Sequence, residues 1–423
     1  MKQNSLFFLA VIIGNIFEMF DFFVFVFLSS IIADVFFPHN IGNLSLIFTY
    51  LTITVGYLLR PIGGIILGNF GDKYGRKSVF TLSILLTAIP SLVIGLIPSY
   101  DKIGYVATFL LIISRVLQGF AAGGEFPGSI TFLAEKYNKK NYYFYCAWLP
   151  FGANIGVAGG ALLIKIMTSS MSKTFLINYG WRIPFICGSL LAVIGFYIRK
   201  NLSESRQFVT LKENHKLYKL PIFNLLKGYL VPLILGIILC TVVSLITGIF
   251  HLFLPSLFVK YLHLSLQDVT GISFIGSFTL AIFIIIFASL TYWIKPMKII
   301  QSAIICLIIS FGLIFIDVLN MKDLYSLSLV VILISVLIAG VNGIYAGILV
   351  DLFPVQVRYS GIAVCFTIGA MLGGGLTPLW TSSILTYLHS YKYIILICMI
   401  VTCICFITNY FIVRLLKNNL HMV

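Results

Sequence analysis

Long apolar runs separated by short polar breaks extend along the whole chain. A helix that crosses a bilayer needs about 20 mostly apolar residues, and runs of that length recur from end to end. The alternation in ten-residue segments that is typical of an outer-membrane barrel is absent from the sequence. The pattern predicts membrane-spanning helices at 6–33, 45–69, 79–98, 104–134, 142–168, 182–199, 229–259, 268–293, 297–317, 324–352, 359–387 and 391–414.

One long polar stretch, residues 200–228, separates the sixth predicted helix from the seventh. It divides the twelve predicted helices into two sets of six, the layout of transporters built from two related halves. We therefore expect an all-α integral membrane fold. The expected parts are an N-terminal half at 1–199, a cytoplasmic loop at 200–228 and a C-terminal half at 229–423.

The composition supports a membrane protein. Of the 423 residues, 60% are hydrophobic and 10% are charged, whereas ordinary soluble domains carry about 25% charged residues. So few charges cannot cover the surface of a soluble protein of this length. The N-terminal apolar run continues into the protein without a small-residue cleavage site, so we interpret it as the first span and not as a removed signal peptide.

The positions of the basic residues explain the net charge of +15. If the N-terminus is cytoplasmic, most Lys and Arg residues fall in cytoplasmic segments and a minority on the opposite side. This asymmetry follows the positive-inside rule and predicts two cytoplasmic termini. The positive charge would then face anionic lipid, so we expect membrane lipids and no nucleic acid among the partners.

Two acids interrupt the first span. Glu18 and Asp21 lie three residues apart in IFEMFDFFVFVF, which places them on one face of a helix. Ionisable groups inside a bilayer are costly and usually face a cavity or a partner. Two carboxylates at this spacing repel each other, so one of them is expected to hold a proton. The alternative is that one acid pairs with a base elsewhere in the bundle.

The fourth span carries a polar stripe. Arg115, Gln118 and Glu125 are separated by three and seven residues, so they share one helix face. At a rise of about 1.5 Å per residue, Arg115 and Glu125 are about 15 Å apart and cannot pair with each other. Each needs a partner from another helix, from water or from a solute. A salt bridge between Arg115 and an acid of the first span would be structural and, if protonation breaks it, would also couple a proton to a conformational change.

Two further ionisable residues are possible solute contacts. Arg60 lies near the end of the second span in LLRPIGG, where the alternative is that it extends to the interface. His251 lies in the seventh span, where the alternative is a hydrogen-bonded core residue. The His and Cys residues show no metal-ligand spacing and no nucleophile–base set. We therefore predict no metal, no cofactor and no enzyme active site.

The stretch GNFGDKYGRK, residues 68–77, concentrates glycine and charge between the second and third spans. It lacks the GxxxxGK[ST] pattern of a phosphate-binding loop and no strand precedes it. We interpret it as a tight cytoplasmic turn in which the acid faces a helix N-terminus, while Arg76 and Lys77 find carboxylates or lipid phosphates. Asp351 and Arg358 flank a second cytoplasmic turn, DLFPVQVRYSG.

These stretches together resemble a known family. GNFGDKYGRK is similar to the loop 2–3 signature of the major facilitator superfamily, and RVLQG is similar to its span-four signature. More narrowly, the chain resembles the metabolite–proton symporter branch, which includes proline/betaine, α-ketoglutarate, citrate and shikimate carriers, and it looks most like the osmoregulatory proline/betaine carriers. The stretches that carry this resemblance are EMFDFFVF, LRPIGGIILGNFGDKYGRK, GLIPSYDKIG, LQGFAAGGEFPGS, YGWRIPF and DLFPVQVRYSG.

The resemblance implies a rocker-switch carrier, here expected to be a monomer in a bacterial inner membrane, with its site between the two halves. The residues that it links with substrate and proton handling are Glu18, Asp21, Arg115, Gln118 and Glu125. The residues expected at the cytoplasmic gate are Gly68, Asp72, Gly75, Arg76, Lys77, Asp351 and Arg358. Asp72 is expected to dock near the start of the eleventh span, around Arg358.

The predicted function is proton-coupled uptake of a small polar metabolite. Acids and bases deep in the membrane are balanced, which suits a zwitterion such as proline, betaine or another amino-acid-like compound better than a tricarboxylate. The phenylalanines of the first span could hold an alkylammonium group by cation–π contact. The alternatives are a proton-coupled organic acid symporter of the dicarboxylate, citrate or shikimate type, or an exporter or facilitator of the same superfamily.

Two departures from the resembled carriers bear on this prediction. Pro150 stands in WLPFG where the resemblance leads us to expect an acid, and this leaves the solute open. The chain ends a few residues after its last span. We therefore expect no osmotic sensing through a long C-terminal coiled coil.

Overall fold

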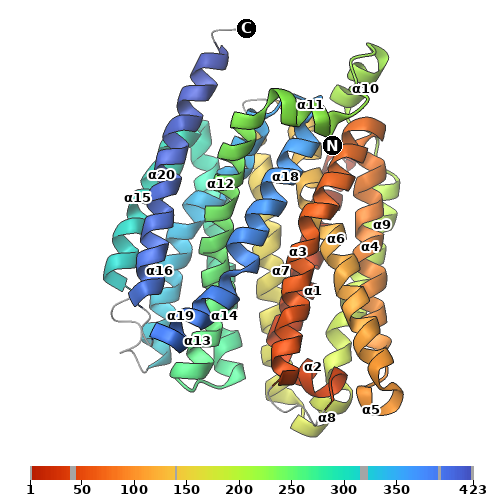
Figure 1. Ribbon diagram of the computed structural model, residues 1–423, viewed down its shortest axis with the longest axis vertical. Helices are drawn as coiled ribbons and strands as arrows, with labels where there is room; N and C mark the ends of the chain where they lie inside the picture. Colours follow the sequence, from red (N-terminus) through yellow and green to blue (C-terminus); the bar gives the residue numbers. More distant parts are fainter. Residues whose placement is uncertain (1, 39–43, 139–140, 315–322, 389–391, 421–423) are drawn as a thin grey trace.

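The computed structural model describes residues 2–38, 44–138, 141–314, 323–388 and 392–420. These residues form helices and short connections, with no strand among them, so the all-α prediction is confirmed. The start of α1 and the end of α20 lie at the same end of the molecule, at the top of Figure 1. We call this end the termini end and the opposite one the far end.

The helices fall into two bundles joined by a short helical segment (Figure 1). The N-terminal bundle contains α1 (Lys2–Phe27), α2 (Ser29–Phe36), α3 (Leu44–Tyr74), α4 (Arg76–Leu96), α5 (Tyr100–Ile103), α6 (Tyr105–Lys136), α7 (Tyr142–Ser170), α8 (Lys173–Asn178), η2 (Gly180–Arg182) and α9 (Ile183–Lys200). The joining segment contains α10 (Arg206–Glu213) and α11 (Pro221–Gly228). The C-terminal bundle contains α12 (Leu230–Gly248), η3 (Ile249–Phe253), α13 (Leu254–Tyr261), α14 (Leu266–Ser289), η4 (Leu290–Tyr292), α15 (Pro296–Ile314), α16 (Leu324–Asn342), α17 (Tyr345–Leu352), α18 (Arg358–Ala370), η6 (Met371–Gly375), α19 (Thr377–Leu388) and α20 (Lys392–Leu420).

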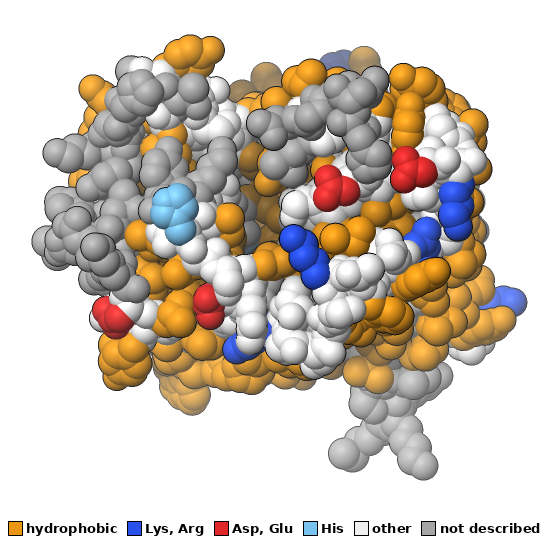
Figure 2. Space-filling model, turned by 90° about the horizontal axis from the view of Figure 1, so that it is seen from below, with side chains coloured by type: hydrophobic (Ala, Val, Ile, Leu, Met, Phe, Trp, Pro, Cys, Tyr) orange, Lys and Arg blue, Asp and Glu red, His pale blue; other side chains and the backbone are white. Residues whose placement is uncertain are grey.

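The predicted spans correspond to these helices. Among the described residues, 11 helices or helix runs are long and apolar enough to cross a membrane, and a further apolar helix, Pro296–Phe311, is shorter. Large apolar side chains such as Leu96, Phe109 and Tyr197 are exposed on the outside, as expected where lipid is the solvent. Seen from the far end, the molecule is hollowed near its centre, with charged side chains beside the hollow (Figure 2).

The two bundles meet along two pairs of long helices. In the N-terminal bundle α1 packs on α7 and α9, and α6 packs on α3 and α4. In the C-terminal bundle α12 packs on α18, α14 on α16, and α15 on α20. The bundles join where α7 lies along α14 and α3 lies along α18.

Small residues allow close helix packing inside each bundle. A Cβ atom at Gly156 of α7 would lie 2.3 Å from the carbonyl oxygen of Ile16 in α1. A Cβ atom at Gly373 of η6 would lie 2.3 Å from the carbonyl oxygen of Thr241 in α12. Backbones at this separation exclude any larger side chain, as is common between helices that pack in membranes.

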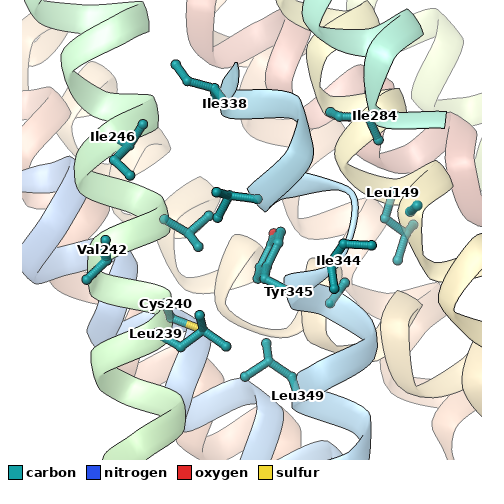
Figure 3. Close-up of a cluster of buried hydrophobic side chains, with 14 of the residues drawn as sticks. Leu149, Leu239, Cys240, Val242, Ile246, Ile284, Ile338, Ile344, Tyr345 and Leu349 are labelled. Atoms are coloured by element: carbon teal, nitrogen blue, oxygen red, sulfur yellow. The ribbon is translucent and has the colours of Figure 1, made fainter. Parts of the chain in front are cut away.

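Three spans of the C-terminal bundle are interrupted near their middle. The α-helical pattern gives way to π-helix at Ile249–Phe253 and at Met371–Gly375, and α16 ends at Asn342 shortly before α17 begins at Tyr345. Beyond this last break, Tyr345 is directed among apolar side chains from α12, α16 and α17 (Figure 3). Such interruptions are common where membrane helices line a transport pathway.

Candidate functional site

A cavity in the N-terminal bundle contains most of the charged residues predicted for the site. Four helices form its wall, namely α1, α3, α4 and α6. Its polar lining consists chiefly of Glu18, Asp21, Arg60, Arg115 and Gln118. Phenylalanines of α1 complete the wall, so the charges lie in an apolar surround where electrostatic interactions are strong.

Asp21 is held by residues from two other helices. Arg115 of α6 donates from Nη1 to Oδ2 of Asp21 at 3.4 Å, and Gln118 donates from Nε2 to the same oxygen at 2.9 Å. The hydroxyl of Ser91 in α4 donates to Oδ1. Arg115 also donates to Oε1 of Gln118 at 2.7 Å. Of the pairings left open for Arg115, the structure therefore shows the one with Asp21.

Glu18 lies beside Arg60 but is poorly satisfied. The nearest oxygen of Glu18 is 3.9 Å from Nη2 of Arg60, and neither carboxylate oxygen accepts a hydrogen bond from any residue that the structure describes. Arg60 does not extend to the interface, because it is buried and its guanidinium lies 4.3 Å from the centre of the Tyr57 ring. Nε of Arg60, and Nε and Nη2 of Arg115, also have no hydrogen-bond partner among the described residues. The cavity thus presents both acceptors and donors that a ligand can use.

Glu125 does not line this cavity and instead pairs with Arg199 in the last turn of α9. Its Oε1 and Oε2 receive hydrogen bonds from Nη2 and Nη1 of Arg199 at 2.5 and 2.9 Å. The hydroxyl of Ser83 also donates to Glu125. Arg199 donates further to the carbonyl oxygens of Ala10 and Phe80, and it is fully buried. The polar residues of α6 therefore belong to two separate clusters, one around Asp21 and one around Arg199.

His251 is a hydrogen-bonded core residue. Its Nε2 lies 3.0 Å from Oδ1 of Asn154 in α7, and its ring meets Phe23 of α1 edge-on, with centroids 5.4 Å apart. His251 is buried and is not part of the lining of the charged cavity. It links η3 of the C-terminal bundle to α1 and α7 of the N-terminal bundle.

At the termini end, Asp72 docks onto the first residues of α18. Its Oδ2 accepts a hydrogen bond from the backbone N–H of Ser360 at 2.8 Å, and its Oδ1 accepts one from Tyr359 at 3.3 Å. A carboxylate is stabilised at a helix N-terminus because the free N–H groups point towards it. A Cβ atom at Gly71 would lie 2.1 Å from the Tyr359 ring, and one at Gly68 would lie 3.1 Å from Cα of Ser360. The glycines allow α3 and α18 to touch.

Arg76 connects four segments at the same end. Its Nη2 is 3.1 Å from Asp72 and 3.0 Å from Glu135 of α6, and it also donates to the carbonyl oxygen of Val355 at 2.8 Å. Arg358 approaches the same Glu135 at 4.0 Å. Glu135 is therefore a central acid of this network, although no sequence pattern pointed to it.

The stretch GNFGDKYGRK is more helical than the interpretation as a turn implied. Helix α3 continues through Tyr74 and α4 begins at Arg76. Gly75 alone separates them, with a φ of 120° that side chains disfavour. Glu204, in the segment before α10, accepts from the backbone N–H groups of Arg76 and Lys77, each at 3.2 Å. No contact is recorded for the Lys77 ammonium group within the described part of the chain.

Asp351 forms a second contact between the bundles at the termini end. It accepts hydrogen bonds from the hydroxyls of Tyr142 and Tyr143, at the start of α7. The second of these measures 2.7 Å. Closer to the cavity, the ring of Phe126 in α6 stacks on Phe366 of α18 with centroids 4.4 Å apart. Of the residues predicted for the gate, Asp72, Arg76, Asp351 and Arg358 make polar contacts between the bundles, and Gly68 packs against Ser360.

Comparison with known proteins identifies the family. The model of the Major Facilitator Superfamily matches residues 11–378. A putative proline/betaine transporter of Staphylococcus aureus is 32% identical over 387 residues, which cover 88% of this chain and 80% of that protein. A glycine betaine/proline/ectoine/pipecolic acid transporter of Dickeya dadantii is 31% identical, covering 87% of this chain and 75% of its own length.

Among solved structures, the proton:xylose symporter XylE bound to 6-bromo-6-deoxy-D-glucose superposes with a TM-score of 0.78 over 98% of this chain and 96% of its own, at 15% identity. A partially occluded, inward-open form of XylE from E. coli gives a TM-score of 0.71. At this identity the likeness shows the shared fold. Together with the family match and the relatives, it establishes that this chain is a multi-pass membrane transporter and belongs to the Major Facilitator Superfamily.

Proposed function

We propose that this transporter imports a small zwitterionic solute together with protons across a bacterial inner membrane, with both termini in the cytoplasm. The observation that carries the proposal is the Asp21–Arg115 pair, which lies in the wall of a cavity beside Glu18 and Arg60. Opposite charges in an apolar cavity match a solute that carries both signs. The printed names of the relatives, which include proline and betaine transporters, support the same solute class.

The cavity offers separate groups to each end of a zwitterion. Free N–H groups on Arg115 and Arg60 suit a carboxylate, because a guanidinium presents paired donors in a plane. Glu18 supplies the opposite charge for a cationic nitrogen. A solute with both groups would satisfy atoms that have no hydrogen-bond partner among the described residues.

Proton coupling follows from the position of Asp21. When Asp21 is ionised, its charge holds Arg115 at 3.4 Å. A proton on Asp21 removes that attraction, while Ser91 and Gln118 still offer hydrogen-bonding partners. Arg115 is then available to the carboxylate of the solute. Proton and solute therefore favour each other's binding, as reciprocal coupling requires.

Alternating access requires the closed end to open. Contacts at the termini end join the bundles through Asp72 and Asp351, whereas the far end is hollowed (Figure 2). With cytoplasmic termini, this arrangement would be the outward-facing state. Inward opening would separate Asp72 from the start of α18 and Asp351 from the two tyrosines.

Organic acid symport is the second candidate, and Arg60 is the observation that favours it. A second guanidinium in the cavity suits a solute with two carboxylates. Glu18 and Asp21 oppose this candidate, because they offset both positive charges. The uptake experiment below separates the two.

The test is uptake into proteoliposomes with an imposed inward proton gradient. Labelled proline, glycine betaine, succinate and citrate form the panel. We expect a zwitterion to accumulate and an uncoupler to abolish accumulation. The Asp21→Asn variant should lose gradient-driven accumulation, whereas Asp34→Asn, which neutralises an exposed acid of α2 outside the cavity, should retain it. If no zwitterion accumulates under the gradient, the proposal is wrong.

A further inference from the structure

Glu18 is a buried carboxylate without a hydrogen bond in the solute cavity. Its side chain is 6% exposed, and its nearest cation, Nη2 of Arg60, is 3.9 Å away. Both oxygens lack a donor among the residues that the structure describes. A carboxylate removed from water is strongly destabilised unless hydrogen-bond donors reach it. The neighbouring Asp21, in contrast, receives three such donors.

The aromatic rings around the cavity are already used by the protein's own cations. The guanidinium of Arg60 lies 4.3 Å from the ring centre of Tyr57 and 5.7 Å from that of Phe22. The guanidinium of Arg115 lies 3.6 Å from the ring centre of Phe25. The expectation that phenylalanines of the first span hold an alkylammonium group therefore does not fit these contacts.

Phe17 is the remaining aromatic ring of the lining, and it is packed against the neighbouring helix α9. A Cβ atom at Gly188 of α9 would lie 3.0 Å from Cε2 of Phe17, and Phe17 is 2% exposed. Recognition of a quaternary ammonium group relies on open aromatic faces. The lining offers a carboxylate to the cationic end of the solute in place of such faces.

The cationic nitrogens of zwitterions differ in whether they can satisfy Glu18. A primary or secondary ammonium group carries N–H bonds that can be donated to the free oxygens of Glu18. A quaternary ammonium group carries none, and its methyl groups would cover those oxygens without a hydrogen bond. A site with a buried acceptor rejects an analogue that lacks the matching donor.

We propose that Glu18 makes this transporter selective for zwitterions whose cationic nitrogen carries at least one N–H bond, such as imino or amino acids, over quaternary ammonium zwitterions. The proposal rests on the proposed function, because it assumes that a zwitterion occupies this cavity. Loss of a hydrogen bond to a charged group weakens binding about 10- to 100-fold. We therefore expect zwitterions with an N–H bond to be preferred over quaternary ones by this factor.

The test uses proline and its N-methylated derivatives in proteoliposomes under an inward proton gradient. Proline, N-methylproline and N,N-dimethylproline differ in whether an N–H bond remains, and each competes against labelled proline. We expect N-methylproline to compete within a few-fold of proline and N,N-dimethylproline to compete at least about tenfold more weakly. α-Methylproline, which adds bulk but keeps its N–H bonds, controls for size.

The Glu18→Gln variant identifies the residue responsible. Its preference for proline over N,N-dimethylproline should fall towards one, whereas Asp34→Asn should keep the wild-type preference. If Glu18→Gln no longer transports, the relative binding of proline and N,N-dimethylproline is measured instead, from the rise in melting temperature that each compound produces in the purified protein.

Three results would overturn the proposal. The first is equal competition by proline and N,N-dimethylproline in the wild type. The second is an unchanged preference for proline in Glu18→Gln. The third is that α-methylproline competes as weakly as N,N-dimethylproline does, because bulk would then explain the difference. Gradient-driven uptake of glycine betaine without uptake of proline would refute this selectivity and leave the proposed function standing. Absence of uptake for every zwitterion would instead refute the proposed function.

Discussion

The buried Glu125–Arg199 pair is predicted to stabilise the N-terminal bundle without taking part directly in solute binding. The side chain of Arg199 is completely buried and that of Glu125 is 2% exposed. Each guanidinium nitrogen of Arg199 has a partner, on Glu125, Ala10 or Phe80. The Glu125→Gln substitution keeps the shape of the side chain and removes its charge. The guanidinium of Arg199 is then left without a counter-charge.

The expected loss of stability is large. Removing one partner of a buried ion pair costs about 3–5 kcal/mol, because the remaining charge is not compensated. Removing both charges is much less costly, since apolar groups of similar volume often replace a buried pair without loss. The double variant Glu125→Gln with Arg199→Met should therefore regain most of the stability. The coupling energy between the two sites should be about 3 kcal/mol or more.

The assay is thermal and denaturant unfolding of the purified single and double variants in detergent. Gradient-driven uptake of the transported solute by the variants that fold provides a second measurement. If Glu125→Gln is as stable as the wild type but loses proton-driven accumulation, the reasoning is refuted. The proton would then act at Glu125 and not at the Asp21–Arg115 pair.

Three further changes test contacts outside the cavity. Gly71→Val should force α3 away from α18, because a Cβ atom there would lie 2.1 Å from the Tyr359 ring; faster amide hydrogen exchange at the start of α18 would show this. Tyr359→Phe removes a hydrogen bond of 2.8 Å to the carbonyl oxygen of Gly124 and should cost about 0.5–1.5 kcal/mol in unfolding experiments, so an unchanged stability would contradict it. The pKa of Asp323 lies below its usual value because the N–H of Ser326 donates to its carboxylate. Ionised Asp323 therefore stabilises the folded state at a pH above its usual pKa, and this stabilisation is lost as the pH falls through its lowered pKa. The difference in melting temperature between wild type and Asp323→Ala should be largest near neutral pH and should shrink in acid.

The helices could be predicted from the sequence because they depend on local composition. About 20 apolar residues in a row can satisfy their backbone in a bilayer only as a helix, and this requirement needs no knowledge of tertiary contacts. The charged residues within the spans were also visible, since a membrane helix rarely tolerates them. That reasoning singled out Glu18, Asp21, Arg60 and Arg115, and the structure places all four in one cavity wall.

The partners of charged residues at the helix ends could not be predicted in the same way. Arg199 lies next to Lys200 at the end of a span, where a base is equally compatible with water and with the protein interior. Consecutive residues of a helix point about 100° apart, so a small error in the helix boundary decides which of the two turns inwards. Glu135 and Glu204 were missed for the same reason, because each lies at or just beyond a helix end among other polar residues.

Helix α6 connects the charged cavity with the closed termini end. Near its middle, Arg115 and Gln118 hold Asp21. Further along, the carbonyl oxygen of Gly124 accepts from Tyr359 of α18, and Glu135 binds Arg76. Every charged group of the cavity belongs to the N-terminal bundle, so a proton or solute that arrives there first changes contacts inside one bundle. Because α6 runs without interruption from Tyr105 to Lys136, we infer that it transmits this change to the contacts between bundles. Weakened coupling between proton and solute in Tyr359→Phe would support this route, and coupling equal to that of the wild type would exclude the Gly124 contact from it.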